Sequence, residues 1–254
     1  MEDGSMLYIL GPGQDMFNHS VEVPIGNDDI NLELSSSTGE RFLVIRAYKD
    51  FEEGEEAFYS YSAASNGRLL MMAGFVAPDN PFDAVELCLT FAVTESSLPL
   101  YLKLAKGLHA GVRKPGSAVV EETKDEFLQL CPGEGEGPTE EVILHVRLTH
   151  KSCAEQVERI LAFLRLQHLT RGGAIATLEA LTASDKDAGS RMMALKLLNS
   201  ILQSLLQGYG RSLEQDEADL PSARAAAEAG GTAHRRACAL CVLVGEKRIL
   251  RGAL

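Results

Sequence analysis

The sequence predicts an α+β protein in which a β-rich region precedes a mainly α-helical region. Apolar and polar residues alternate with a period of two at 30–34 and at 58–62, which is typical of strands. Apolar residues recur every three or four positions at 157–164 and 195–209, which is typical of amphipathic helices. The character changes near residue 83, so we predict two domains, residues 1–82 and residues 83–254.

Length and composition limit the possible classes. The chain has 254 residues, of which 45% are hydrophobic and 24% charged, ordinary values for a globular protein. Its formal net charge of −12 argues against nucleic-acid binding, which needs clustered basic residues, and suits a basic protein partner instead. It contains no apolar run of about twenty residues, so we expect no membrane span. We also expect a monomer.

Cysteine usage and the first residues predict the compartment. The five cysteines are odd in number and scattered, which indicates a reducing environment rather than a disulfide framework. The start Met1-Glu2-Asp3-Gly4-Ser5 lacks the basic and apolar parts of a secretory signal. We therefore expect the cytoplasm, with the nucleus or a plastid as alternatives.

The first region contains several expected strands. Residues 6–10 form a short apolar run that Gly11-Pro12-Gly13 ends, which predicts a buried strand and a tight turn. Ile30, Leu32 and Leu34 alternate with polar residues, so we expect a half-buried strand. The turn residues 36–39 connect it to 42–45, and the pair predicts an antiparallel hairpin.

The stretch 58–75 combines an aromatic strand, a turn of small residues and a short helix. An extended segment 58–62 would place Tyr59 and Tyr61 on the same face. Ser65 supplies a helix cap, residues 69–72 form a short helix, and Gly74 can end it. Tyr61 is thereby expected near a strand end, shortly before a helix; the alternative interpretation is a buried aromatic strand edge.

The second region begins with a strand and continues with helices. Residues 85–93 predict an apolar strand, and Pro99 begins a helix that runs to about Gly107. Residues 118–130 and 142–148 show no clear pattern. The run 133–137 is expected to be a surface loop rather than a phosphate loop, because its carboxylates would repel phosphate.

The last hundred residues predict the core helices. Core stripes are expected at Val157, Ile160, Leu161 and Leu164, and at Leu195, Leu198, Ile201, Leu202, Leu205 and Tyr209. An alanine-rich segment at 222–229 is followed by Gly230-Gly231 and a closing helix that extends through Leu240 to Leu250.

Candidate metal and nucleophile residues do not assemble into a site. Cys238 and Cys241 are spaced like half of a zinc site, but no second pair lies near, so we interpret them as small apolar side chains one helical turn apart. The histidines lack ligand-like spacing and are expected to be surface or satisfied core residues: His109, His145, His150, His168 and His234.

Two short motifs resemble a known family. The sequence DMFNHS at 15–20 and the sequence YSAASN at 61–66 are similar, in order and spacing, to the Asn-His and Tyr-Gly-x-x-Ser-Asn motifs of SET domains. In that family the motifs meet in a knot-like crossing that forms the S-adenosylmethionine pocket. The resemblance implies a β-rich SET segment at 1–82.

The C-terminal half resembles one branch of the SET family. Residues 160–165 with Leu169-Thr170, and the sequence LVGEKRIL at 243–250, are similar to the substrate-binding domain of the Rubisco large-subunit methyltransferase type, which includes the actin-histidine methyltransferase. The resemblance implies methyl transfer from S-adenosylmethionine to a lysine or histidine nitrogen of a protein substrate, actin-like or other. The alternative is a non-catalytic protein-binding module that derives from such an enzyme.

The resemblance also implies site residues. Tyr61 corresponds to the catalytic tyrosine, Asn18 and His19 to the motif that hydrogen-bonds the cofactor, and Ala73 to a cofactor-lining position. Asp15, Met16 and Phe17 are implied to supply main-chain cofactor contacts. No metal is implied.

The sequence also departs from the family. Gln14, Ser62 and Ala64 differ from the actin-histidine enzyme, which leaves the acceptor open between lysine and histidine. The N-terminal half of the SET domain has no counterpart, so we expect this chain to correspond to the C-terminal part of a longer enzyme and to bind S-adenosylmethionine weakly by itself.

Overall fold

The computed structural model describes residues 13, 16–24, 30–107, 111–113, 126–132, 140–171 and 188–254. The chain divides into two compact units, Met1–Ala64 with Asp79–Pro81, and Ser65–Pro78 with Phe82–Leu254. Some sequence predictions lie outside the described residues: the strand at 6–10, the cofactor contact at Asp15, the surface or core position of His109 and the loop at 133–137.

The first unit contains two small sheets. Strand β2 (Ile30–Leu34) pairs with β3 (Arg41–Ile45) in antiparallel register, so the predicted hairpin is confirmed. The expectation of a half-buried strand is wrong at Leu34, which is 67% exposed. Within the described residues this sheet is a two-stranded ribbon, and such a ribbon shields only part of each side chain.

The second sheet of this unit joins segments forty residues apart. Strand β1 (Asn18–His19) pairs in parallel with β4 (Phe58–Tyr59). The predicted strand 58–62 is therefore too long. The ladder ends after Tyr59 because the main-chain N–H of Tyr61 donates to the His19 side chain instead of to a neighbouring strand.

The second unit begins with helix α1 (Asn66–Ala73), so the predicted short helix is confirmed but starts at Asn66 rather than at Leu69. The Ser65 hydroxyl accepts a hydrogen bond from the Arg68 N–H at 3.3 Å and caps the helix. Gly74 ends the helix in the left-handed conformation with φ of 78°.

A four-stranded sheet follows in the order β5-β8-β7-β6. These strands are β5 (Ala84–Val93), β6 (Gly111–Arg113), β7 (Glu126–Pro132) and β8 (Glu140–Thr149). The first three in spatial order pair antiparallel, and β6 runs parallel to β7. The predicted α+β class and the strand at 85–93 are confirmed, but the region after residue 83 contains more β structure than the sequence predicted.

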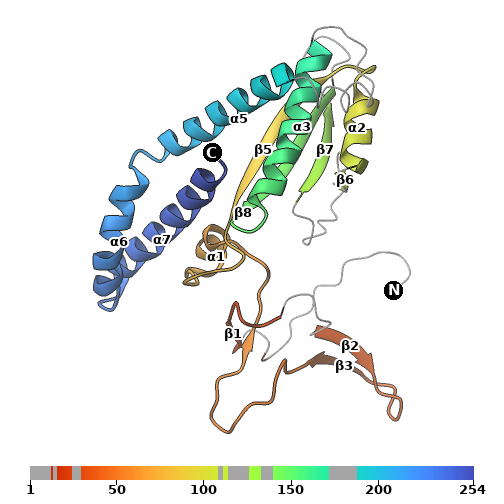
Figure 1. The fold of residues 1–254 in the computed structure, drawn as a ribbon. Helices are drawn as coiled ribbons and strands as arrows, with labels where there is room; N and C mark the ends of the chain where they lie inside the picture. Colours follow the sequence, from red (N-terminus) through yellow and green to blue (C-terminus); the bar gives the residue numbers. More distant parts are fainter. Residues whose placement is uncertain are drawn as a thin grey trace. The chain divides into compact units, whose positions relative to one another are not determined.

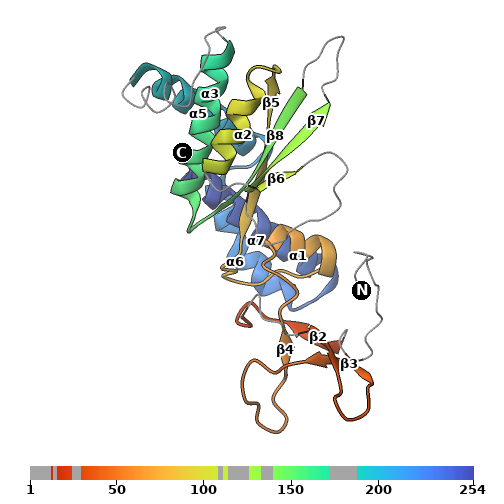
Figure 2. The same cartoon turned by 90° about the vertical axis from the view of Figure 1, so that its right-hand side faces the viewer.

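Helices α2 (Leu98–Gly107) and α3 (Cys153–Arg171) cover one face of this sheet (Figure 1). The view in Figure 2 shows the same two helices on that side of the strands. Phe91, Tyr101 and Phe163 meet there, with ring centroids 5.8 to 6.1 Å apart. All three rings are buried, and they join sheet and helices into one apolar core.

Three long helices complete the second unit: α5 (Ala188–Gly208), α6 (Leu213–Ala227) and α7 (Gly231–Gly252). Helices α6 and α7 run side by side, and Gly230 and Gly231 form the turn between them with φ of 71° and 58° (Figure 1). The predicted core stripe of α5 is confirmed at Leu198 and Leu202 and wrong at Leu195 and Leu205, which are exposed.

Candidate functional site

The β1–β4 pair brings the two SET-like motifs together at Tyr61. The Tyr61 hydroxyl donates a 2.9 Å hydrogen bond to the main-chain carbonyl of Phe17, and the Tyr61 N–H donates a 3.1 Å hydrogen bond to Nδ1 of His19. The His19 and Tyr61 rings lie 5.2 Å apart between centroids. Three contacts thus join residues that are more than forty positions apart in the sequence.

His19 is held in its neutral form. Partial burial lowers the pKa of His19, whereas its hydrogen bond with the Tyr59 main chain acts in the opposite direction. An unprotonated Nδ1 can accept the Tyr61 N–H, and a protonated one cannot. Neutral His19 therefore shapes the backbone turn that follows β4.

The remaining candidate residues of the first motif have different surroundings. The Asn18 amide donates a 2.6 Å hydrogen bond to the Glu56 carboxylate, and both residues are exposed. The Met16 N–H donates to the Gly13 carbonyl at 3.3 Å, and the Met16 side chain is 79% exposed. The structure therefore groups Phe17 and His19 with Tyr61, whereas the Asn18 side chain bonds to Glu56.

Ala73 belongs to a different compact unit from Tyr61. It is the last residue of α1 and is exposed, and α1 belongs to the second compact unit. Its implied role as a cofactor-lining residue stays a prediction.

The last residue of the second motif has a structural role that the sequence did not suggest. Asn66 at the start of α1 donates its N–H to the Asp83 carboxylate at 3.0 Å, and its side-chain carbonyl accepts from the Ala77 N–H at 2.9 Å. Asp83 also accepts from the Ala84 N–H at 3.2 Å. Both Asn66 and Asp83 are buried, so this set of hydrogen bonds anchors α1 and the following loop.

Helix α7 has a glycine where this anchor contacts it. A Cβ atom at Gly245 would overlap the Asp83 carboxylate, so only glycine allows the close approach of Asp83. The neighbouring Glu246 accepts a 2.8 Å hydrogen bond from the Tyr209 hydroxyl. Burial raises the pKa of Glu246, and the charge of Asp83 raises it further.

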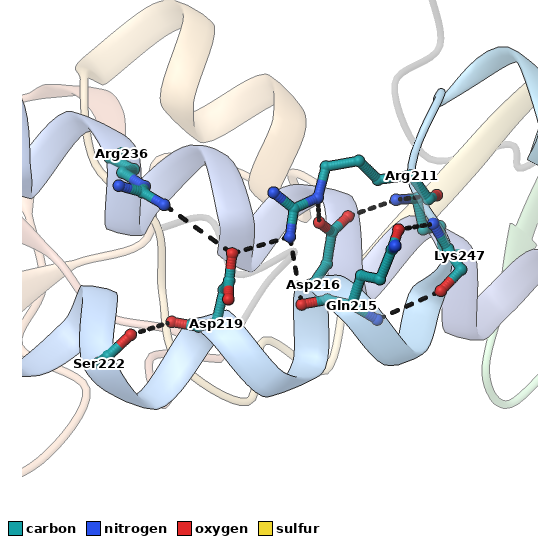
Figure 3. A network of polar contacts seen from close by, with 8 residues as sticks. Arg211, Gln215, Asp216, Asp219, Ser222, Arg236 and Lys247 are labelled. Carbon is teal, nitrogen blue, oxygen red and sulfur yellow. Dashed lines mark hydrogen bonds and ion pairs between the residues drawn. The ribbon is translucent and has the colours of Figure 1, made fainter.

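The next residue of α7 lies in a buried ion network. Lys247 and Asp216 form an ion pair, and their side chains are 1% and 0% exposed. Lys247 also donates to the Arg211 carbonyl at 2.9 Å, and its ammonium lies 5.2 Å from the centre of the Tyr209 ring. The Arg211 guanidinium lies 2.8 Å from the second Asp216 oxygen (Figure 3).

This network fixes the register of α6 against α7. Ser212 and Gln215 form a capping box at the start of α6, one residue before Asp216. Exposed ion pairs extend the contact along the hairpin, from Arg248 to Glu217 at 2.7 Å and from Arg251 to Glu214 at 2.6 Å. The sequence GEKR at 245–248 is thereby explained residue by residue as the packing surface of α7.

The described residues contain no group of three or more side chains that could hold a metal ion. Cys238 is buried and Cys241 half-buried on α7, as expected of a mainly structural pair. None of the helices in the described ranges is long and apolar enough to cross a membrane.

Sequence reasoning missed Asp83, Gly245 and Asp216, and one of the three had a detectable signal. Gly245 interrupts an otherwise strong helical pattern, which often marks a close contact. Asp216 lies four residues after Ser212, in the first turn of a capped helix, where an acidic residue is common; nothing in that position predicts complete burial.

Comparison with known proteins supports the C-terminal resemblance. The family model for the Rubisco LSMT substrate-binding domain matches residues 122–250, just over half of the 254 residues. A search of curated proteins found no match. The matched range includes β7, β8, α3, α5, α6 and α7 up to Leu250, together with the buried ion network. On this evidence the chain belongs to the Rubisco LSMT substrate-binding family, whose domain is typical of SET-domain protein methyltransferases.

Proposed function

We propose that this protein functions as an S-adenosylmethionine-dependent methyltransferase, which modifies a lysine or histidine nitrogen of a protein substrate. In this proposal residues 1–82 are SET-domain sequence and residues 83–254 are the substrate-binding domain. The observation that carries it is the contact of Tyr61 with Phe17 and His19, because it joins the two motifs that the SET resemblance requires to meet.

The group of residues fits the cofactor chemically. S-adenosylmethionine would supply the electrophilic methyl group, and it carries both hydrogen-bond donors and acceptors. The exposed Asn18 amide and the main chain of residues 16–19 offer both kinds of partner. The buried Ser60 hydroxyl has no hydrogen-bond partner within the described part of the chain, so one further polar contact can be made beside Tyr61.

Tyr61 is the proposed catalytic residue. Methyl transfer is an in-line displacement, so the protein contributes mainly by aligning a neutral acceptor nitrogen and by excluding water. The hydrogen bond to Phe17 holds the Tyr61 hydroxyl in one direction, and His19 holds its main chain. A hydroxyl held in this way can orient the acceptor nitrogen and the methyl group.

A second candidate function is a protein-binding module without catalysis. It is favoured by the position of the family match, which covers residues 122–250 and excludes Tyr61 and the first motif. The second compact unit also has its own apolar core. Both candidates imply a protein partner and differ in whether Tyr61 is needed.

Tyr61→Phe separates the two candidates. The protein is tagged at its C-terminus in its own cells and isolated. It is then incubated with methyl-labelled S-adenosylmethionine and with an extract of cells that lack this protein. We expect Tyr61→Phe to lower labelling about 100-fold, the usual loss for one aligned polar group. Tyr48→Phe is the matched control, because the Tyr48 ring packs edge-on against Phe51 in the same unit and its loss of a hydroxyl should leave labelling unchanged.

Equal labelling by the Tyr61→Phe variant and the parent would contradict the catalytic assignment. If a partner protein is isolated together with the parent protein but no protein is methyl-labelled, the binding module is the correct candidate.

A further inference from the structure

The solvent-facing side of the β5–β8 pair carries a cysteine and a histidine in contact. Cys88 on β5 lies directly opposite His145 on β8 in the antiparallel register, and its Sγ atom is 3.2 Å from Nδ1 of His145. Cys88 is exposed, whereas its strand neighbour Leu87 points into the core. Because Leu144 and Val146 are buried on the same side as Leu87, the sheet core holds the pair rigidly.

The surroundings keep Cys88 protonated at rest. Partial burial raises the pKa of the Cys88 thiol, and the negative charge of Glu86 on the same strand raises it further. Arg147, which lies opposite Glu86 in the register, donates to the Phe82 carbonyl at 2.7 Å. A protonated thiol is a poor nucleophile, so reaction at Cys88 requires a base within hydrogen-bond distance.

We propose that Cys88 is a modification site for low-molecular-weight disulfides, with His145 as the base that removes the thiol proton. In the reaction Nδ1 of His145 takes the proton, and Sγ of Cys88 attacks one sulfur of the disulfide. A new S–S bond forms, the original S–S bond breaks, and the leaving thiolate takes the proton from His145. The inference does not depend on the proposed methyl transfer.

The other cysteines provide an internal comparison. Cys153 and Cys238 are buried, which limits access to a disulfide reagent. Cys241 is the serious competitor, because it is only half-buried and the Arg224 guanidinium donates to its sulfur at 3.4 Å. Cys88 should react faster because its sulfur is more accessible and its base is fixed on the adjacent strand.

The test measures the four cysteines whose side chains the structure describes, each separately. The 254-residue protein is incubated with glutathione disulfide at neutral pH, quenched with acid at intervals and digested, and peptide mass spectrometry follows mixed-disulfide formation. We expect the initial rate at Cys88 to exceed the rates at Cys241, Cys153 and Cys238 by about tenfold or more, the order of effect that a positioned base supplies. A faster reaction at Cys241 than at Cys88 would overturn the proposal, and this result needs no variant.

A variant pair then tests the base. His145→Gln should slow the Cys88 reaction about tenfold and leave the Cys241 reaction unchanged. The matched control is His150→Gln, since His150 lies in the exposed turn after β8 and should not affect either rate. A Cys88 rate in folded His145→Gln equal to that of the parent would refute the role of His145; circular dichroism establishes that the variant is folded.

Discussion

The segment around Tyr61 and the α6–α7 hairpin are stabilised by different interactions. In the described part of the first unit, Val23 and Ala64 are the only buried apolar side chains, and strand pairs and polar contacts at partly exposed residues connect its segments. The hairpin has buried Leu213, Leu220 and Val244, and an ion pair with almost no exposure. Water or a ligand can replace the contacts of the first segment, whereas a broken contact in the hairpin leaves a buried group uncompensated.

The largest expected effect comes from breaking the buried ion pair. Lys247→Met leaves the buried Asp216 carboxylate with the partly exposed Arg211 guanidinium as its remaining ionic partner, so we expect a loss of about 3 kcal/mol in the free energy of unfolding. Urea unfolding followed by circular dichroism measures it. The matched control is Arg248→Gln, which removes an exposed ion pair with Glu217 and should cost about 0–1 kcal/mol.

A double variant sharpens this result. Asp216→Leu combined with Lys247→Met removes both charges, so the double variant should be more stable than Lys247→Met alone. If Lys247→Met and the Arg248→Gln control have the same free energy of unfolding, the hairpin does not depend on its buried ion pair. The proposed difference in stabilisation between the two regions would then be wrong.

A smaller loss is expected where α7 contacts the α1 anchor. Gly245→Ala places a methyl group against the Asp83 carboxylate, and we expect a cost of about 1–3 kcal/mol from overpacking. Gly252→Ala is the control, because no heavy atom lies within 4 Å of a Cβ at that position of the same helix. It should be neutral or slightly stabilising, since alanine favours the helix. Equal melting temperatures for the two variants would show that Asp83 moves freely.

The smallest effects are opposite pH dependences in the two regions. The pKa of His19 is lowered from 6.5 in the folded segment, so protonation favours the unfolded segment. The stability that the His19 contact contributes is therefore lost as the pH falls below 6.5. The pKa of Glu246 is raised from 4.5, so the protonated folded form is favoured, and its contribution is lost as the pH rises above 4.5.

Hydrogen exchange at several pH values, corrected for the intrinsic rate, separates these two effects. Protection near Tyr61 should decrease as the pH falls below about 6.5, whereas protection of α7 near Glu246 should increase as the pH falls from neutral toward 5. Glu246→Gln should remove the dependence in α7, and Glu228→Gln on exposed Glu228 should leave it unchanged. A common pH dependence in both regions would contradict their separation.

The local sequence was sufficient to predict elements whose patterns depend on near neighbours. The hairpin at 30–45, the capped helix after Ser65 and the strand at 85–93 all follow from period, caps and turn residues. The motif pair also predicted that residues 15–19, Tyr61 and Ala73 would share one site, and the structure places Phe17 and His19 of these in contact with Tyr61. Their chemical roles stay proposals.

Only the tertiary structure could identify the contacts that join distant residues. Asp216 and Lys247 are separated by 31 positions, and each alone resembles an ordinary surface charge; their burial depends on how α6 packs against α7. The same holds for Asp83 at Gly245, and for Cys88 beside His145, where strand register decides which side chains meet. A sequence specifies local periods directly, but register and helix contact depend on the packing of the whole core.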